Sequence, residues 1–161
     1  MAKTLYTLEV FLFGAPVSEE FAKANPVVCR TIEIRGDQTL QQLHGAIFEA
    51  FGRWEEHMYE FHFGDGPRDY SRGRYGIRLP FEMAGFSDDG EPAGDAAKTT
   101  IDSLGLDMGQ LFFYWFDFGD DWYHRVNVLA IGQTEPKVKY PRVTERVGES
   151  PPQYMDEEED E

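Results

Sequence analysis

Apolar and polar residues alternate along two segments near the start of the chain, and this pattern is typical of strands with one buried face. Residues 5–13 are rich in β-branched and aromatic side chains and stop before Gly14 and Pro16, which terminate strands. Residues 27–34 alternate in the same way. The sequence therefore predicts two strands, and we expect them to pair antiparallel.

A helical period replaces the alternation between residues 40 and 51. Thr39 and Gln42 have the spacing of a capping box at a helix start, and Gly52 is typical of a helix end. The apolar residues in between recur at helical spacing: Leu40, Leu43, Ile47, Phe48 and Phe51. The sequence predicts one amphipathic helix at about 40–51.

The middle of the chain contains one more clear strand and a long irregular segment. Residues 58–63 alternate again and predict the third strand. Residues 64–98 are rich in Gly, Pro, Asp and Arg, and only residues 77–81 within them predict a short strand. A loop of this length is usually functional or disordered. A short helical turn is predicted at 100–105.

Two β-rich segments, residues 111–118 and 122–131, predict a long hairpin at about 111–131. The Gly-Asp pair at 119–120 suits a two-residue type II′ turn that pairs Phe118 with Asp121. This register places six side chains on the core face: Leu111, Phe113, Trp115, His124, Val126 and Val128. It leaves an aromatic outer hairpin face: Phe112, Tyr114, Phe116 and Tyr123.

The order of these elements predicts an α+β fold with a mixed sheet and one main helix. It is similar to a β-grasp or ubiquitin-like roll, in which the helix packs across the strands, and such a likeness carries no function. At 161 residues the chain has the size of one domain, which we expect to span residues 1–150. The last six residues are all acidic, and we expect residues 151–161 to form a disordered acidic tail.

Composition narrows the range of functions. Asp and Glu number 30 against 15 Lys and Arg, which gives a net charge of -15. This charge repels phosphate backbones and anionic lipids, so we do not expect non-specific nucleic-acid binding or membrane association. The single cysteine, Cys29, cannot form an internal disulfide, and neither a signal peptide nor a membrane-spanning run is visible. We expect a cytoplasmic protein.

Asp117 and His124 are the candidate catalytic residues, because the predicted hairpin places them diagonally opposite each other. An aspartate that orients an imidazole occurs in general-base catalysis and at metal sites. The alternative is a buried histidine that a carboxylate satisfies structurally. The four histidines lack zinc spacing and the acidic turn lacks that of a calcium loop, so we expect no metal and no cofactor.

Positive charge is concentrated in the long loop, near Tyr70 and Tyr75. Four arginines supply it: Arg68, Arg72, Arg74 and Arg78. Arginines beside aromatic rings are suited to bind phosphate or stack on a base. The alternative is that they pair with the chain's own carboxylates.

A spaced set of residues carries a family resemblance. Its most specific element is Asp117-Phe118-Gly119-Asp120, followed by Trp122 and His124. The other members are His44, His57, Tyr59, Glu60, Phe61, Tyr140 and Pro141. In this order and spacing they resemble the plasmid pRiA4b open-reading-frame-three-like family. The resemblance implies a plasmid or mobile-element setting and no particular reaction.

Three functions remain open at this point. The first is a non-catalytic binding or adaptor domain, whose outer hairpin face contacts a protein partner or a second copy of the chain. The second is an enzyme that uses Asp117 and His124 in a small pocket, with help from His57, Glu60 or the arginine loop. The third is nucleic-acid contact through residues 68–78, which the net charge disfavours.

Overall fold

The structure is a computed structural model that describes residues 2–15, 17–66, 69, 71–76, 94–117 and 121–151. Several predicted features fall outside these ranges. They are Arg68, Arg78, the strand at 77–81, residues 118–120 of the hairpin turn, and residues 152–161 of the acidic tail.

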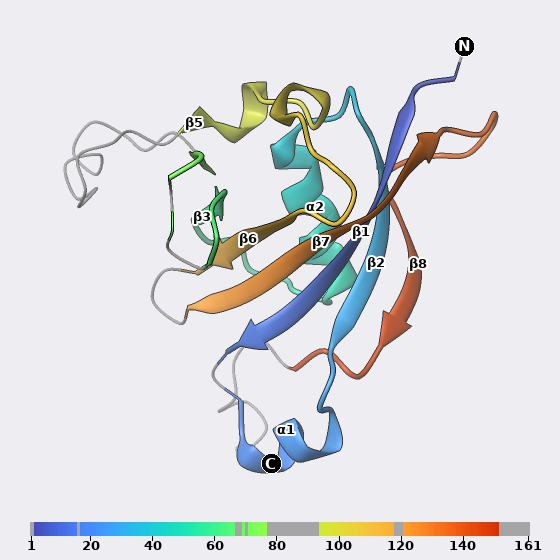
Figure 1. The fold of residues 1–161 in the computed structure, drawn as a ribbon. Helices are drawn as coiled ribbons and strands as arrows, with labels where there is room; N and C mark the ends of the chain where they lie inside the picture. Colours follow the sequence, from blue (N-terminus) through green and yellow to red (C-terminus); the bar gives the residue numbers. More distant parts are fainter. Residues whose placement is uncertain are drawn as a thin grey trace.

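Within these described residues, eight strands form a single sheet with few helices (Figure 1). The strands are β1 (Thr4–Gly14), β2 (Cys29–Arg35), β3 (Tyr59–His62), β4 (Arg74–Gly76), β5 (Gly94–Asp95), β6 (Leu111–Phe116), β7 (Trp122–Gln133) and β8 (Arg142–Val147). The helices are α1 (Glu19–Ala24), α2 (Leu40–Ala50) and the 3₁₀ turns η1 (Ala96–Lys98) and η2 (Asp102–Leu104). In the described ranges, no helix is long and apolar enough to cross a membrane.

The strands are ordered β5-β4-β3-β6-β7-β1-β2-β8 across the sheet. The pairs are antiparallel apart from β4 with β5, which is parallel, so the sheet is mixed. The antiparallel pairing of β1 with β2 is confirmed, with Leu8 opposite Ile32. Together with α2, this arrangement confirms the α+β class.

Helix α2 packs against one face of the sheet, which we call the inner face (Figure 1). The predicted capping box is present: the Thr39 side chain accepts from the Gln42 backbone, and the Gln42 side chain accepts from the Thr39 backbone. The apolar stripe is buried as expected, with Leu40, Leu43 and Ile47 fully covered by the sheet. The predicted helix is therefore confirmed to within a residue.

The register of the β6–β7 hairpin differs from the prediction by one residue. Phe116 pairs with Trp122, so the connection spans residues 117–121 and is not a two-residue turn. Asp117 and Asp121 at its ends have φ of 65° and 58°, and the Asp121 amide donates to the Asp117 carbonyl. A two-residue Gly-Asp turn was therefore the wrong prediction.

A one-residue slip moves every side chain of one strand to the opposite face. The faces of β7 are as predicted, and those of β6 are reversed. Phe112, Tyr114 and Phe116, expected on the outer face, are 0% exposed in the core. The prediction of an outer hairpin face made from these three rings was wrong, and Tyr123 alone of that set lies outside.

Strand β8 and helix α1 are absent from the sequence-based prediction. Strand β8 is an edge strand that is mostly exposed, so it lacks the apolar contrast that marks a half-buried strand. Helix α1 has six residues and buries none of them, and its start is capped by the Ser18 side chain, which accepts from the Phe21 amide. Short exposed elements leave little hydrophobic signal.

Candidate functional site

Four of the residues that carry the family resemblance, His44, Tyr59, Trp122 and His124, gather on the inner face of the sheet, beside α2. Seven side chains form one connected group, which we call the inner cluster: His44, Arg53, Glu56, Tyr59, Tyr114, Trp122 and His124. Helix α2, the segment after it and strands β3, β6 and β7 each contribute to it.

Arg53 is the centre of this cluster, and the sequence analysis did not identify it. Its guanidinium carbon lies 4.8 Å from the ring centre of Phe51, 5.1 Å from that of Phe116 and 4.9 Å from that of Trp122. These are cation–π distances. Only 7% of the residue is exposed, and burial lowers its pKa to about 10, so it remains charged at neutral pH. A lone arginine after a helix C-cap gives no sequence signal for such a role.

Arg53 also fixes the protonation state of His124. Its Nη2 lies 2.8 Å from His124 Nε2, and because a guanidinium only donates, this imidazole nitrogen accepts. The proton is therefore on Nδ1, 3.2 Å from the Tyr114 carbonyl. Burial, and then the charge of Arg53, hold the pKa of His124 well below its usual value. His124 is neutral and 0% exposed, which removes it from contact with a dissolved substrate.

A second histidine links helix α2 to strand β6. The Glu56 carboxylate accepts from His44 Nε2 at 2.9 Å, so Nδ1 is free to accept from the Tyr114 hydroxyl at 2.6 Å. The ring of His44 is stacked on Tyr59, with centroids 3.8 Å apart. The hydroxyl thus donates to the imidazole and the imidazole to the carboxylate, which is the hydrogen-bond order of a carboxylate–imidazole–hydroxyl triad. The hydroxyl is sealed in the core, however, and burial raises the pKa of Tyr114 well above its usual value.

The structure does not bring the predicted pair of Asp117 and His124 together. Asp117 Oδ2 instead lies 3.5 Å from Nε2 of His57, while His124 bonds to Arg53 and to the Tyr114 carbonyl. The reason is the hairpin register, which moves Asp117 out of the strand and into the loop. The two candidate catalytic residues therefore do not contact each other, although both act on Arg53: His124 accepts a hydrogen bond from it, and the charge of Asp117 opposes the lowering of its pKa.

The two described arginines of the long loop pair with the chain's own carboxylates. Arg74 contacts Glu60 at 2.8 Å, and Arg72 contacts Asp65 at 2.7 Å. Glu60 also accepts from His62 Nε2 at 2.9 Å. Burial opposes ionisation of Glu60, yet these hydrogen bonds hold its pKa below its usual value. The charges of Arg72 and Arg74 are therefore each paired with a carboxylate of the chain, at an exposed position for Arg72 and a partly buried one for Arg74.

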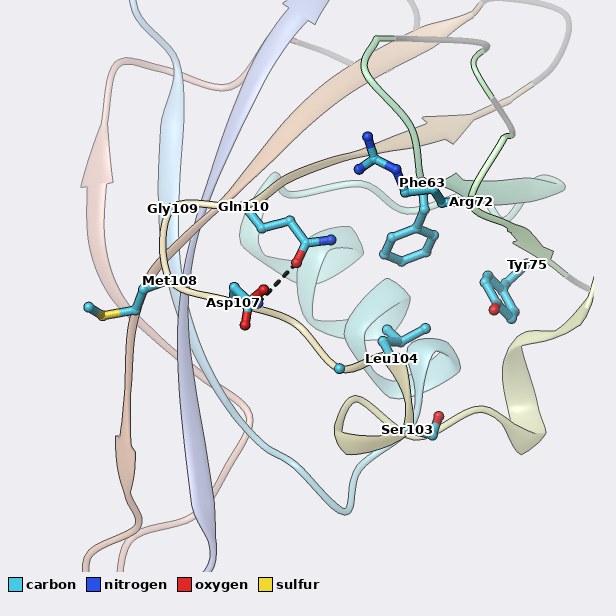
Figure 2. A pocket seen from close by; sticks show the side chains of 10 residues that line it. Phe63, Arg72, Tyr75, Ser103, Leu104, Asp107, Met108, Gly109 and Gln110 are labelled. Carbon is cyan, nitrogen blue, oxygen red and sulfur yellow. Dashed lines mark hydrogen bonds between the residues drawn. The ribbon is translucent and has the colours of Figure 1, made fainter.

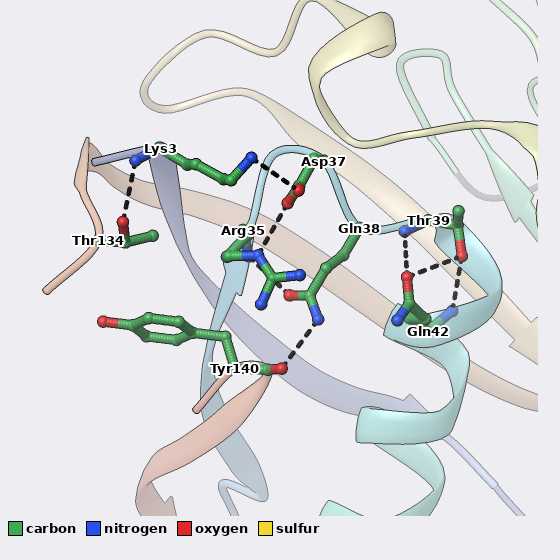
Figure 3. A network of polar contacts seen from close by, with 8 residues as sticks. All are labelled: Lys3, Arg35, Asp37, Gln38, Thr39, Gln42, Thr134 and Tyr140. Carbon is green, nitrogen blue, oxygen red and sulfur yellow. Dashed lines mark hydrogen bonds and ion pairs between the residues drawn. The ribbon is translucent and has the colours of Figure 1, made fainter. Parts of the chain in front are cut away.

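Tyr140, which Pro141 follows in the chain, lies at the start of helix α2 and outside the inner cluster (Figure 3). The Gln38 amide donates to the Tyr140 carbonyl at 2.8 Å, and the Arg35 backbone amide donates to the Gln38 side chain at 2.9 Å. The last turn before the helix is thereby tied to the segment that leads into β8. This network is structural.

The opposite, outer face of the sheet carries a second group of residues. Strands β1, β7 and β6 each contribute three alternate side chains to an array that we call the outer patch; the registers align all of them except Phe13, which lies at an irregularity of β1 and joins the patch through its ring contacts. Its members are Glu9, Phe11, Phe13, Tyr123, Arg125, Asn127, Leu111, Phe113 and Trp115.

The rings of the outer patch contact one another across the strands. Phe13 lies 6.3 Å from Phe113 and 6.0 Å from Tyr123 between ring centres, and Tyr123 is stacked on Trp115 at 5.8 Å. Phe13 is 51% exposed and Leu111 39% exposed. A large phenylalanine half in solvent, in contact with further rings, is typical of a protein contact surface.

Arg125 and Glu9 are the charged members of the outer patch. The guanidinium of Arg125 lies 4.7 Å from the ring centre of Phe11, and Glu9 accepts from the Asn127 side chain at 3.1 Å. The patch as a whole is neutral, while the chain carries a net charge of -15.

Two hollows in the described surface complete the list of candidate sites. One, of about 580 Å³, lies between the β3–β4 hairpin and the loop before β6 (Figure 2). The other, of about 520 Å³, lies between α2 and β8. Neither of these two hollows is lined by Asp117 or His124.

Comparisons with other proteins place the chain among relatives of unknown function. Residues 17–158 match the family described as plasmid pRiA4b ORF-3-like protein. The uncharacterized protein y4hQ of Sinorhizobium fredii (strain NBRC 101917 / NGR234) is 32% identical over 131 residues, which are 80% of this chain and 59% of that protein. The chain thus spans less than two thirds of that relative's length.

A solved structure shares the fold. It is the crystal structure of MM3350, a protein of unknown function from Methanosarcina mazei Go1, with a TM-score of 0.71 and 23% identity. The match covers 94% of this chain and 74% of that chain. At this identity the likeness shows the fold alone. None of these comparisons indicates a catalytic role.

Proposed function

We propose that this chain, which belongs to the plasmid pRiA4b ORF-3-like family, is a non-catalytic binding module whose outer patch contacts a second copy of the chain. The observation that supports the proposal most is the array of contacting rings with Phe13 half in solvent at its edge. The proposal keeps the binding or adaptor function that the sequence predicts, but it assigns this function to a different set of residues.

The residue types of the outer patch support a protein occupant. Tryptophan, tyrosine and arginine dominate the binding energy of protein interfaces, and the patch contains Trp115, Tyr123 and Arg125 side by side on two strands. Charged residues are depleted at the centre of such interfaces. The patch has only two charged residues, Glu9 and Arg125, and no net charge, on a chain that is otherwise strongly acidic.

A second copy suits the outer patch because the patch is self-complementary. A two-fold contact requires that each residue finds its counterpart on an identical surface. Arg125 and Glu9 lie on the same face of neighbouring strands, so a two-fold axis near Phe11 would set each arginine against the glutamate of the other copy. Two sheets packed face to face in this way would form a sandwich.

The inner cluster gives the enzyme hypothesis less support. His124 is fully buried and hydrogen-bonded at both nitrogens, and the Tyr114 hydroxyl is sealed beneath α2. A general base has to reach the proton that it removes, directly or through one water. The cluster is therefore better suited to hold α2 on the sheet than to act on a substrate.

The fold is further proposed to be a β-grasp-like roll. The β1–β2 hairpin is followed by a capped helix that packs across the inner face, and β1 lies in the interior of the sheet. An experimental structure in which α2 leaves the strands would contradict this assignment.

The self-contact is tested by sedimentation velocity over a wide range of protein concentration. We expect the unmodified chain to dimerise and the double variant Phe13→Ser, Leu111→Ser to remain monomeric with an unchanged circular dichroism spectrum. Met108→Ser is the matched control, because Met108 is exposed and apolar but lies outside the patch. A wild-type chain that is monomeric at every concentration, or a double variant that dimerises equally well, would overturn the proposal.

A further inference from the structure

The hollow between the β3–β4 hairpin and the loop before β6 has an aromatic floor (Figure 2). Phe63, Tyr75 and Leu104 supply its apolar surface, and the rings of Phe63 and Tyr75 meet edge to face with centres 5.5 Å apart. Its volume of about 580 Å³ is within the range of small-molecule sites. A flat apolar group of a ligand would be covered by this floor.

The side-chain amide of Gln110 is oriented by the protein itself. The Asp107 backbone amide donates to Gln110 Oε1 at 2.9 Å, and since a backbone N–H only donates, the oxygen position is fixed. The NH₂ group is therefore turned away from this bond, and Figure 2 shows it directed toward the space beside Phe63. The hollow thus contains a preoriented hydrogen-bond donor.

Arg72 supplies a second donor at the rim, on the other side of Phe63 from Leu104 (Figure 2). One nitrogen of its guanidinium is held by Asp65 at 2.7 Å. A guanidinium has five N–H groups in a planar fork, so this contact leaves several of them for another acceptor. Both donors favour a ligand that accepts hydrogen bonds. A carboxylate is the most suitable acceptor, because its hydrogen bonds with arginine are charge-assisted.

Asp107 and Ser103 limit the number of negative charges that a ligand in this hollow can have. The carboxylate of Asp107 also lines the hollow, and the Ser103 hydroxyl donates to the Thr100 carbonyl at 2.7 Å, which leaves its oxygen as an acceptor. A second negative charge on the ligand would face this side. The lining therefore disfavours dianions.

We propose that this hollow binds a small organic monocarboxylate with an aromatic ring, the ring lying on Phe63 and Leu104 and the carboxylate meeting Gln110 and Arg72. The site is independent of the outer patch, which lies on other strands and on the opposite face of the sheet from Phe63. It adds a ligand class to a protein that is proposed above to bind a second copy of itself.

The test is a titration of the ¹⁵N-labelled full chain, followed through the backbone amide resonances of the residues that line the hollow and, in the wild type, also through the side-chain NH₂ resonances of Gln110. The probes are benzoate, its neutral analogue benzyl alcohol and the dianion terephthalate. We expect benzoate to shift these resonances in a saturable way and to bind about tenfold more tightly than either analogue.

Gln110→Glu is the decisive variant, because the new side chain still accepts from the Asp107 amide, replaces the NH₂ donors with an oxygen and adds a negative charge next to the ligand carboxylate. Benzoate should bind this variant about tenfold more weakly, and Gln41→Glu, the same change at an exposed residue of α2 that does not line the hollow, should bind it as the wild type does. Equal binding of benzoate and benzyl alcohol, unchanged binding in Gln110→Glu, or no shift at millimolar benzoate would each overturn the proposal.

Discussion

The two faces of the sheet differ in how their polar groups are used. On the inner face, Arg53, His44 and His124 are surrounded by rings or hydrogen-bonded within the core, and solvent reaches little of them. On the outer face, Arg125 is exposed and Phe13 is half in solvent. Inside, the polar groups hold the fold together. Outside, a similar mixture of rings and charge is available to another molecule.

The comparison shows that a pattern of histidine, aspartate and tryptophan is not by itself a sign of catalysis. Trp122 and His124, the most specific residues of the family pattern, both contact Arg53 in the core. A buried cation requires such partners, because an uncompensated charge in the core is costly. A family resemblance that rests on residues of this kind therefore indicates a shared fold and does not by itself indicate a shared reaction.

Removal of the Trp122 side chain should have the largest effect on stability. The residue is fully buried and covers one side of the Arg53 guanidinium, so Trp122→Ala creates a cavity and exposes a buried charge. We expect the free energy of unfolding to fall by about 3–5 kcal/mol in a urea titration. A loss below about 1 kcal/mol would show that the inner cluster does not stabilise the fold.

Acid should destabilise the protein through two of its buried histidines, His44 and His124. Burial lowers the pKa of His44 and of His124, so the unfolded chain takes up protons below about pH 6.5 while the folded chain does not. The free energy of unfolding should therefore fall as pH drops from about 6.5 to 5, with a slope of up to about 1.4 kcal/mol per pH unit for each histidine.

The variant His124→Gln isolates one of these two contributions. It lacks the titrating imidazole of His124, so its slope of stability against pH between about 6.5 and 5 should be smaller than that of the wild type. Urea titrations at several pH values measure both slopes. Equal slopes would mean that His124 is protonated in the folded state.

Loss of the Tyr114 hydroxyl should have an intermediate effect. Tyr114→Phe keeps the ring in place and leaves His44 Nδ1 as a buried acceptor without its 2.6 Å donor. An unpaired buried polar group costs about 1–3 kcal/mol, which a urea titration resolves. An unchanged midpoint would indicate that His44 finds another partner.

Substitutions in the outer patch should have the smallest effect on the free energy of unfolding and the largest effect on dimerisation. Phe13→Ala removes a ring that is already half in solvent, so it should cost about 1 kcal/mol or less. The same change should weaken dimerisation by much more than it weakens the fold. Similar losses in both measurements would mean that Phe13 acts as a core residue.

Long amphipathic elements were predictable from the sequence. Helix α2 and strands β1, β2 and β3 have buried and exposed positions at a clear period, and the structure places them within two residues of the predicted ends. Strand β7 is predicted with the correct faces for the same reason, since Tyr123 and Arg125 alternate with His124 and Val126. Periodicity therefore accounts for most of the fold.

The candidate site was harder to predict, because it depends on one turn. All six residues of β6 are apolar, so the strand carries no internal signal for which face is buried, and its orientation follows from the hairpin register alone. A Gly-Asp pair indicates a two-residue turn, yet the left-handed Asp117 and Asp121 open a five-residue connection. That difference separates Asp117 from His124 and exchanges the two faces of β6.

The central claim is that the outer patch contacts a second copy, and a photo-crosslinking amino acid in place of Phe13 tests it most directly. Irradiation of the purified chain should give a product of twice the chain mass, with the crosslink mapping to patch residues such as Leu111 or Arg125. The same amino acid in place of Met108 should give no such product. Absence of the double-mass product with the crosslinker at residue 13, or crosslinks that map outside the patch, would contradict the account.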